Sequence, residues 1–401
     1  MFKRISLLVM AVVLLLSVSG AAGATAKVAP ASGVIPGQYI VVFKDTVSNP
    51  GDTASDMARK HGLGLLYIYG YAIKGYAATI PAARLDAVKA DPRVLFVSED
   101  REVSIGEQTL PTGIDRIDAE QTATHTNKGA GVNVAVIDTG IDLKHPDLKA
   151  NIVGGKNCST GKSYNDGNGH GSHVAGIIAA VNNTVGVVGV APEAKVWAVR
   201  VLNNAGSGTW SSVICGIDFV TRKAPDNGGP ITVANMSLGG TGSDDGNCGL
   251  TNNDALHQAI CRSVAAGVTY VVAAGNETDD AANHVPAAYD EVITVSALSD
   301  SDGKPGGTGG APSCRTSEKD DYFATFSNFG ADVDIAAPGV CILSTWKGGG
   351  YNTISGTSMA SPHVAGAATL YIATHLGATP AQVRDALIAA QIGRASCRER
   401  V

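Results

Sequence analysis

The sequence lacks an excess of positive charge. Its 401 residues carry 30 lysines and arginines against 36 aspartates and glutamates, a net charge of −6. Proteins that bind nucleic acid or an anionic membrane usually do so through a broad basic surface, so neither partner is expected. Beyond residue 26 the sequence also lacks an apolar run long enough to span a membrane. We therefore expect a soluble mature chain, and we also expect it to be a monomer.

The first residues have the pattern of a secretory signal peptide. Two basic residues precede an apolar run from Ile5 to Val18, and small residues follow. A membrane anchor is the alternative, but the run is short for a membrane span. We predict a signal peptide over residues 1–24, with residue 26 as an alternative end, and hence a secreted, extracellular protein in which disulfides can form.

The segment that follows predicts a small domain of its own, over residues 27–106. Its apolar patterns indicate strands at 38–45, 65–70, 75–80 and 93–100 and helices at 53–62 and 81–91. The order β-α-β-β-α-β is that of an α+β, ferredoxin-like unit. The segment contains no convincing cluster of catalytic residues, so an accessory role is expected.

Residues 107–390 predict an α/β domain with a mostly parallel sheet and helices on both faces. Nearly continuous apolar strands alternate with helices, as in sheets that are buried on both sides. The strands fall at 132–140, 195–202, 231–240, 267–276 and 292–298, and the helices at 173–181, 210–222 and 253–266. Ligands of such sheets lie beyond the carboxyl ends of the strands. Asp138 and Asn276 both fall at such ends, which indicates an active site there.

Three short motifs offer a carboxylate, an imidazole and a hydroxyl: "VIDTGID" (136–142), "GHGSHVAG" (169–176) and "SGTSMASPHVAG" (355–366). A serine hydroxyl needs a neighbouring base to act as a nucleophile, and the base needs an orienting group. Ser358 begins a predicted helix, whose free N–H groups favour a developing oxyanion. Ala360 replaces the last glycine of G-x-S-x-G, which argues against an esterase or lipase of the α/β-hydrolase type.

These motifs resemble those of the subtilisin-like serine peptidases, the subtilases. "DTGID", "HGSHVAG", "AAGN" and "GTSMASPHVAG" occur in the family's order, and the resemblance covers residues 34–390. It implies a secreted serine endopeptidase, made as an autoprocessed zymogen, that hydrolyses proteins and peptides through an acyl-enzyme.

The resemblance also assigns roles within the site. Asp138 would orient His170, His170 would act as general base and acid, and Ser358 would be the nucleophile. The Asn276 side chain and the Ser358 backbone N–H would bind the oxyanion. In subtilisin, loss of that asparagine costs roughly 2.7–4 kcal/mol.

Each residue has a simpler alternative. Asp138 and Asn276 could be turn residues, and Ser358 could be a helix cap. His170 and His173 could both bind a metal, but no third ligand is evident, so no catalytic metal is expected. A catalytically inactive homologue that only binds peptides is the alternative function, against which the intact set of four residues argues.

Further residues carry over from the resemblance as substrate contacts. They lie in "MSLGG" and "NAGSG", read as two strands that pair with an extended peptide, and in their surroundings: Ser237, Leu238, Gly239, Gly206, Ser207, Gly208, Gly275 and Trp210. His284 departs from the family near the base of the specificity pocket. The preferred substrate side chain therefore stays open, with an apolar or aromatic one as the default.

Residues 27–106 gain a role from the same resemblance. "YIVVFKD" resembles the start of the subtilase propeptide, which assists folding and inhibits the enzyme. We expect the chain to cut itself between about Val103 and Thr109.

Structural calcium is implied as well, because oxygen-rich loops suit this ion. The ligands of a strong site would be Gln108, Asp147 and Asn183 with the carbonyls of Val181, Val185 and Val187. A weaker site would use Asp334 with the carbonyls of Ala287, Tyr289 and Val292. A well-packed loop without metal is the alternative.

Six of the seven cysteines allow 15 pairings. Our hypothesis is Cys158–Cys215, Cys248–Cys261 and Cys314–Cys341, because each pair would join loops near in sequence or fold. Free buried thiols are the alternative.

The seventh cysteine, Cys397, lies in the tail "IGRASCRERV". A DNA sequence that resembles a widely used sequencing-library adapter encodes these ten residues in order. We therefore predict that residues 391–401 are not native and that the catalytic domain is truncated after Ala390.

Overall fold

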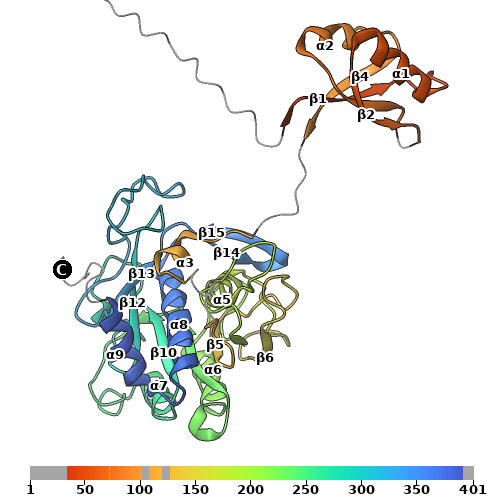
Figure 1. Cartoon of the computed structure of the whole chain (residues 1–401). Coiled ribbons are helices and arrows are strands. Elements are labelled where there is room, and N and C mark those ends of the chain that lie inside the picture. Colours follow the sequence, from red (N-terminus) through yellow and green to blue (C-terminus); the bar gives the residue numbers. More distant parts are fainter. Residues whose placement is uncertain (1–33, 72, 102–107, 120–126, 392–401) are drawn as a thin grey trace, which may run out of the picture. The chain divides into compact units, whose positions relative to one another are not determined.

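The computed structural model describes residues 34–71, 73–101, 108–119 and 127–391 (Figure 1). The predicted signal peptide, the predicted cleavage segment up to residue 107 and residues 392–401 lie outside these ranges. The chain divides into two units, residues 1–104 and 105–401. No helix among the described residues is long and apolar enough to cross a membrane.

The first unit has the predicted β-α-β-β-α-β order. Its elements are β1 (Val34–Phe43), α1 (Pro50–His61), β2 (Gly64–Tyr69), β3 (Gly75–Thr79), α2 (Ala82–Lys89) and β4 (Val94–Arg101). The strands form an antiparallel sheet in the order β2-β3-β1-β4. Met57 of α1 and Val88 of α2 are fully buried with Tyr76 of β3 in one core, so both helices cover the same face of the sheet.

The larger unit contains a seven-stranded parallel sheet in the order β13-β12-β10-β8-β5-β7-β6. Its strands are β5 (Asn133–Asp138), β6 (Ile152–Asn157), β7 (Lys195–Arg200), β8 (Ile231–Met236), β10 (Thr269–Ala273), β12 (Ile293–Leu298) and β13 (Ile335–Pro338). Alternate residues of β5 belong to two separate cores: Val134 and Val136 face one, Ala135 and Ile137 the other. The sheet is therefore buried on both faces, as predicted.

Helices cover these two faces (Figure 1). Residues of α5 (His170–Ala179), α8 (Thr357–Thr374) and α9 (Pro380–Gln391) belong to one core, and residues of α6 (Trp210–Thr221) and α7 (Ala255–Ala265) to the other. The remaining elements are short: α3 (Thr112–Arg116), η1 (Pro225–Asn227), β9 (Gly240–Thr241), η2 (Ala281–Asn283), β11 (His284–Val285), β14 (Ile342–Trp346), η3 (Lys347–Gly349) and β15 (Gly350–Ile354).

The sheet order places the predicted site residues at one edge. β5 and β10 both pair with β8 and run parallel to it. Asp138 ends β5, and Asn276 follows the end of β10. Both residues therefore lie at the carboxyl edge of the sheet, on either side of the strand that leads into Ser237.

Candidate active site

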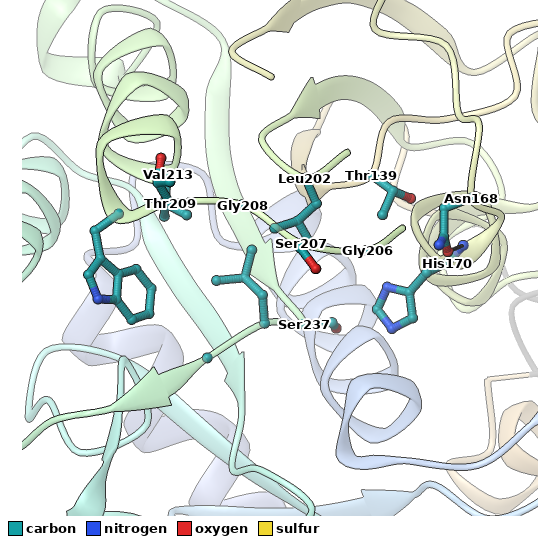
Figure 2. A pocket seen from close by; sticks show the side chains of 13 residues that line it. Thr139, Asn168, His170, Leu202, Gly206, Ser207, Gly208, Thr209, Val213 and Ser237 are labelled. Carbon is teal, nitrogen blue, oxygen red and sulfur yellow. Dashed lines mark hydrogen bonds between the residues drawn. The ribbon is translucent and has the colours of Figure 1, made fainter. Parts of the chain in front are cut away.

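An aspartate and a histidine form the best-defined pair of the site. Asp138 is completely buried at the end of β5, and His170 is the first residue of α5. The His170 Nδ1 atom lies 2.9 Å from both carboxylate oxygens of Asp138. This contact fixes the ring and leaves Nε2 for the cleft, where Figure 2 shows the imidazole.

A second aspartate holds the start of α5, and it was not predicted from the sequence. Asp166 Oδ1 accepts hydrogen bonds from the N–H groups of Asn168 and Gly169, and Oδ2 accepts from the N–H and hydroxyl of Ser172. The Thr139 hydroxyl also donates to Asp166. Asp166 thus joins the end of β5 to the first turn of α5, as a helix cap does. Its position four residues before His170 was the available signal.

The two aspartates set the protonation of the histidine. Burial by itself lowers the pKa of His170, but the charge of Asp138, its hydrogen bond and the charge of Asp166 outweigh burial and raise the pKa above its ordinary value. The charged imidazolium is the form that carboxylates stabilise. The site can therefore accept a proton at His170 and retain it while charge develops nearby.

The acid side of the activity profile follows from this shift. If neutral His170 is the base, kcat/KM falls as pH drops through the raised pKa, so we expect the midpoint of the acid limb above 6.5. Initial rates on a peptide substrate from pH 4.5 to 9 measure it. His375→Gln, a change at an exposed histidine of the same unit, should leave the midpoint unchanged. A midpoint at or below 6.5 would contradict the assignment.

Ser358 lies in the first turn of α8, next to the end of β8. Its hydroxyl donates to the carbonyl of Ser237 at 3.4 Å, and the Ser237 hydroxyl donates to the carbonyl of Ser358 at 2.9 Å. Among the described residues the Ser358 hydroxyl is thus bonded to Ser237 rather than to His170. Catalytic hydrogen bonds are often formed only when substrate is bound, so this arrangement agrees with a nucleophile at rest.

The amide of Asn276 is oriented by the residue before Ser358. Asn276 Oδ1 accepts from the backbone N–H of Thr357 at 2.9 Å and from its hydroxyl at 3.2 Å. With the oxygen engaged, the NH₂ group is the part left for a ligand. The preceding Gly275 has φ +108°, and a Cβ there would come within 2.2 Å of Asn328, so only glycine fits this turn.

The predicted substrate residues line two neighbouring cavities. A cleft of about 700 Å³ is bordered by His170, by Gly206, Ser207 and Gly208, and by Ser237 across from them (Figure 2). Trp210, Leu238 and Gly239 also line it. A cavity of about 210 Å³ is bordered by Gly275, Asn276, His284 and Ser358. All eight predicted contacts therefore face these cavities.

One detail of that prediction was wrong. "NAGSG" and residues 237–239 were read as strands, but the structure assigns neither as a strand. Two segments that face each other across an open cleft form no ladder hydrogen bonds with each other, so they are not assigned as strands.

His284 stands beside two carboxylates at the smaller cavity. Its Nε2 atom lies 3.0 Å from Asp279 and its Nδ1 atom 3.7 Å from Glu277. The departure that the sequence indicated at the pocket base is thus a histidine between two carboxylates.

The residues of the predicted strong calcium site form one hydrogen-bonded network. The Gln108 amide contacts the carbonyls of Val181 and Val187 and the N–H of Asn183, and Asn183 and Val187 both donate to Asp147. Tyr351, which was not predicted, also donates to Asp147 at 2.8 Å. Carbonyls, amides and one carboxylate are the oxygen ligands that calcium prefers, and the opposite orientation of the Gln108 amide would add its oxygen.

The predicted weaker calcium site does not fit the ion. Asp334 Oδ1 accepts from the guanidinium of Arg384, and Oδ2 accepts from the N–H of Thr294. The Ala287 carbonyl accepts from the Thr294 hydroxyl at 2.7 Å. A cationic side chain already compensates the carboxylate, so the contacts of Asp334, Ala287, Tyr289 and Val292 do not support a metal there.

Six cysteines are bonded in the pairs of the hypothesis: Cys158–Cys215, Cys248–Cys261 and Cys314–Cys341.

The alternative of His170 and His173 as a metal pair is not supported. To bind one metal ion, each histidine would have to direct a ring nitrogen toward it. The Nε2 atom of His173 instead lies 3.0 Å from the carbonyls of Ile342 and Asn352.

Comparison with known proteins places this geometry in a family. Residues 129–398 match the model of the subtilase family, and residues 38–106 match that of the peptidase inhibitor I9. Subtilisin NAT of Bacillus subtilis subsp. natto is 38% identical over 356 residues, which cover 87% of this chain and 84% of the relative. Subtilisin DY of Bacillus licheniformis is 41% identical over 284 residues, covering 70% and 90%.

Two further comparisons agree. An extracellular serine proteinase of Thermus sp. (strain Rt41A) is 38% identical over 384 residues, covering 88% of this chain and 84% of the relative. The crystal structure of a cold adapted subtilisin-like serine proteinase superposes with a TM-score of 0.54 at 39% identity, over 65% of this chain and 82% of that one. The chain therefore belongs to the subtilase family and is a serine endopeptidase with an N-terminal I9 inhibitor domain.

Proposed function

We propose that Ser358 is the nucleophile, His170 its base and Asp138 the group that orients His170. The contact of His170 Nδ1 with both oxygens of the buried Asp138 carries this proposal, because it leaves Nε2 free at the cleft. Ser237, which is hydrogen-bonded to Ser358, lines the same cleft. As the Ser358 oxygen bonds to the carbonyl carbon of the peptide, its proton passes to Nε2. The imidazolium then gives this proton to the leaving amine, and water hydrolyses the acyl-enzyme by the same route.

The oxyanion would be bound by two donors that the resting site already holds in place. The first is the Asn276 NH₂ group, oriented by the bonds of its oxygen to Thr357. The second is the backbone N–H of Ser358 in the first turn of α8. Donors that are fixed before the reaction stabilise the transition state without reorganising.

A substrate would lie extended between residues 206–208 and 237–239 and pair with both. This mode uses backbone hydrogen bonds for affinity and side-chain pockets for selection. In the smaller cavity, the Glu277 carboxylate beside His284 disfavours an acidic substrate side chain. Apolar and aromatic side chains are compatible with the apolar wall formed by Leu238, Ala273 and Val285.

We also propose that the enzyme is secreted and that its own I9 domain inhibits it until self-cleavage between about residues 103 and 109. The extracellular serine proteinase among the relatives and the three disulfides support export. The alternative of an inactive binding homologue has no support in the comparisons, since the aligned relatives are proteinases.

Covalent labelling tests the identity of the nucleophile. A sulfonyl fluoride should inactivate the mature enzyme with one equivalent, and the added mass should map by tandem mass spectrometry to Ser358. Denatured enzyme, in which no base activates the hydroxyl, should not be labelled. Labelling of another serine with full loss of activity would refute the assignment.

Calcium would bind in the network of Gln108, Asp147, Asn183 and the carbonyls of residues 181, 185 and 187, where it would compensate the Asp147 carboxylate. At about one hundred times its Kd an ion adds about 2.7 kcal/mol to the free energy of unfolding. For a domain of this size that equals roughly 5–10 °C.

The prediction is that chelation lowers the melting temperature of the inhibited enzyme by about this amount and that Asp147→Asn abolishes the response. Scanning calorimetry with and without calcium measures it. Asp334→Asn is the matched control, since its carboxylate is bonded to Arg384, and its response should remain that of wild type. An equal calcium response in Asp147→Asn would contradict the site.

A further inference from the structure

A fully buried histidine lies among carboxylates in α7, which covers the face of the sheet opposite α5 and α8. His257 belongs to α7, and none of its side chain is exposed. Its Nε2 atom lies 2.9 Å from Glu291 Oε2. Its Nδ1 atom lies 3.5 Å from Asp244 Oδ1 and 3.4 Å from Asp245 Oδ1, and it has no hydrogen-bond partner.

The Nδ1 atom of His257 therefore faces two carboxylate oxygens without a hydrogen bond to either. If Nε2–H donates to Glu291, the lone pair of Nδ1 points toward two negatively charged oxygens. Both oxygens of Asp245 accept hydrogen bonds from backbone N–H groups of the loop, which stabilise the ionised carboxylate: those of Asn247, Gly249, Thr251 and Asn252. A cation between Nδ1 and the two carboxylates would satisfy the lone pair and both oxygens.

The distances favour a metal ion over a proton as that charge. A charge-assisted hydrogen bond from Nδ1–H to a carboxylate measures about 2.7–2.9 Å, shorter than both contacts. Two ligands at about 2.1 Å from a tetrahedral zinc ion are about 3.4 Å apart, which matches them. The Glu291–His257 contact also has the form of the carboxylate–histidine–zinc arrangement, in which the other ring nitrogen donates to a carboxylate.

Other candidate ligands are excluded by chemistry. Cys248 and Cys261 lie near His257 but are bonded to each other, so neither offers a thiolate. Calcium prefers oxygen ligands, whereas imidazole with carboxylates suits zinc and related divalent ions. The Asp244 side chain is 18% exposed, which leaves a path for the ion and for a water as further ligand.

We propose that His257 Nδ1, Asp244 and Asp245 bind a divalent transition-metal ion of the zinc type, with Glu291 orienting the histidine. The ion would join α7 to the loop between β9 and α7 and, through Glu291, to the segment before β12. That loop continues from residues 237–239 of the substrate cleft. The site would thus hold one wall of the cleft in place, independently of the catalytic residues.

Zinc chloride is titrated calorimetrically into the mature enzyme, inactivated with a sulfonyl fluoride, without reductant and with calcium in excess. One zinc per chain is expected at the site. His257→Phe keeps the ring that stacks on Tyr289 at 4.0 Å but should abolish binding, and Glu291→Gln should weaken it about 10–100-fold. Asp244→Asn, the substitution expected to disturb the fold least, should weaken zinc binding at least as much as Glu291→Gln.

His375→Phe is the matched control, since His375 also stacks on a tyrosine at 4.0 Å, and its zinc affinity should equal that of wild type. A cobalt absorption band of a tetrahedral site that disappears in Asp244→Asn would support the proposal. Two outcomes would overturn it: zinc affinity unchanged in His257→Phe and Asp244→Asn, or nitrogen NMR that shows His257 doubly protonated at neutral pH with zinc present.

Discussion

The Ser358→Ala precursor is expected to remain uncut between residues 103 and 109 and to hydrolyse casein no faster than the background. Without the hydroxyl, His170 has no nucleophile to activate, so the acyl-enzyme cannot form. Loss of this group from a serine–histidine–aspartate triad costs about six orders of magnitude in kcat. Gel mobility and the mass of the N-terminal fragment report maturation, and casein hydrolysis reports activity.

Two controls separate loss of chemistry from loss of fold. Ser355→Ala removes a hydroxyl three residues earlier in the same motif, one that accepts a hydrogen bond from the N–H of Cys341, and this variant should mature normally. A trace of mature wild-type enzyme should cut the Ser358→Ala precursor in trans. Maturation of Ser358→Ala without added protease would contradict the proposed mechanism.

The positions of Asp138 and Asn276 could be predicted because they depend on local signals. A buried apolar strand followed by a polar residue places that residue at the carboxyl edge of a parallel sheet, whatever its partners are. The helix at Ser358 was predicted in the same way. In the structure Asp138, Asn276 and Ser358 belong to three segments that meet at this edge.

Strand β6 was not predicted, because it lacks the apolar run that marked the other strands. It contains Gly154, Gly155 and Lys156 and lies at the edge of the sheet, where an apolar run is not needed. The hairpin β14–β15 was missed as well, although its strand β14 packs against α5 through the bond of the Ser344 hydroxyl to the His173 carbonyl.

Local sequence patterns could not predict contacts between residues that are distant in the sequence. Asp166 supports His170, Tyr351 binds Asp147 across 204 positions, and Arg384 pairs with Asp334. The last contact weakens the case for the second calcium site, because the carboxylate expected to bind the ion is engaged by an arginine from α9. A buried carboxylate needs a compensating positive charge, which can be expected from the sequence. Tertiary packing decides whether that charge is a metal ion or a basic side chain.

Asn276→Ala is expected to lower kcat by about 10²–10³ while KM changes little. The Asn276 amide would contact the substrate oxygen only when negative charge develops on it, so its removal destabilises the transition state more than the bound substrate. Initial rates over a range of peptide concentrations separate the two constants.

Thr357→Val offers a graded comparison for this prediction. It removes the hydroxyl that donates to Asn276 Oδ1 and accepts from the N–H of Gly275, but it keeps the backbone N–H that bonds to the same oxygen. One lost hydrogen bond of about 1 kcal/mol would let the amide move and should lower kcat about 5-fold, far less than Asn276→Ala. If Asn276→Ala instead raised KM at constant kcat, the amide would bind ground-state substrate, and the backbone N–H of Ser358 would be left as the oxyanion donor of the proposed site.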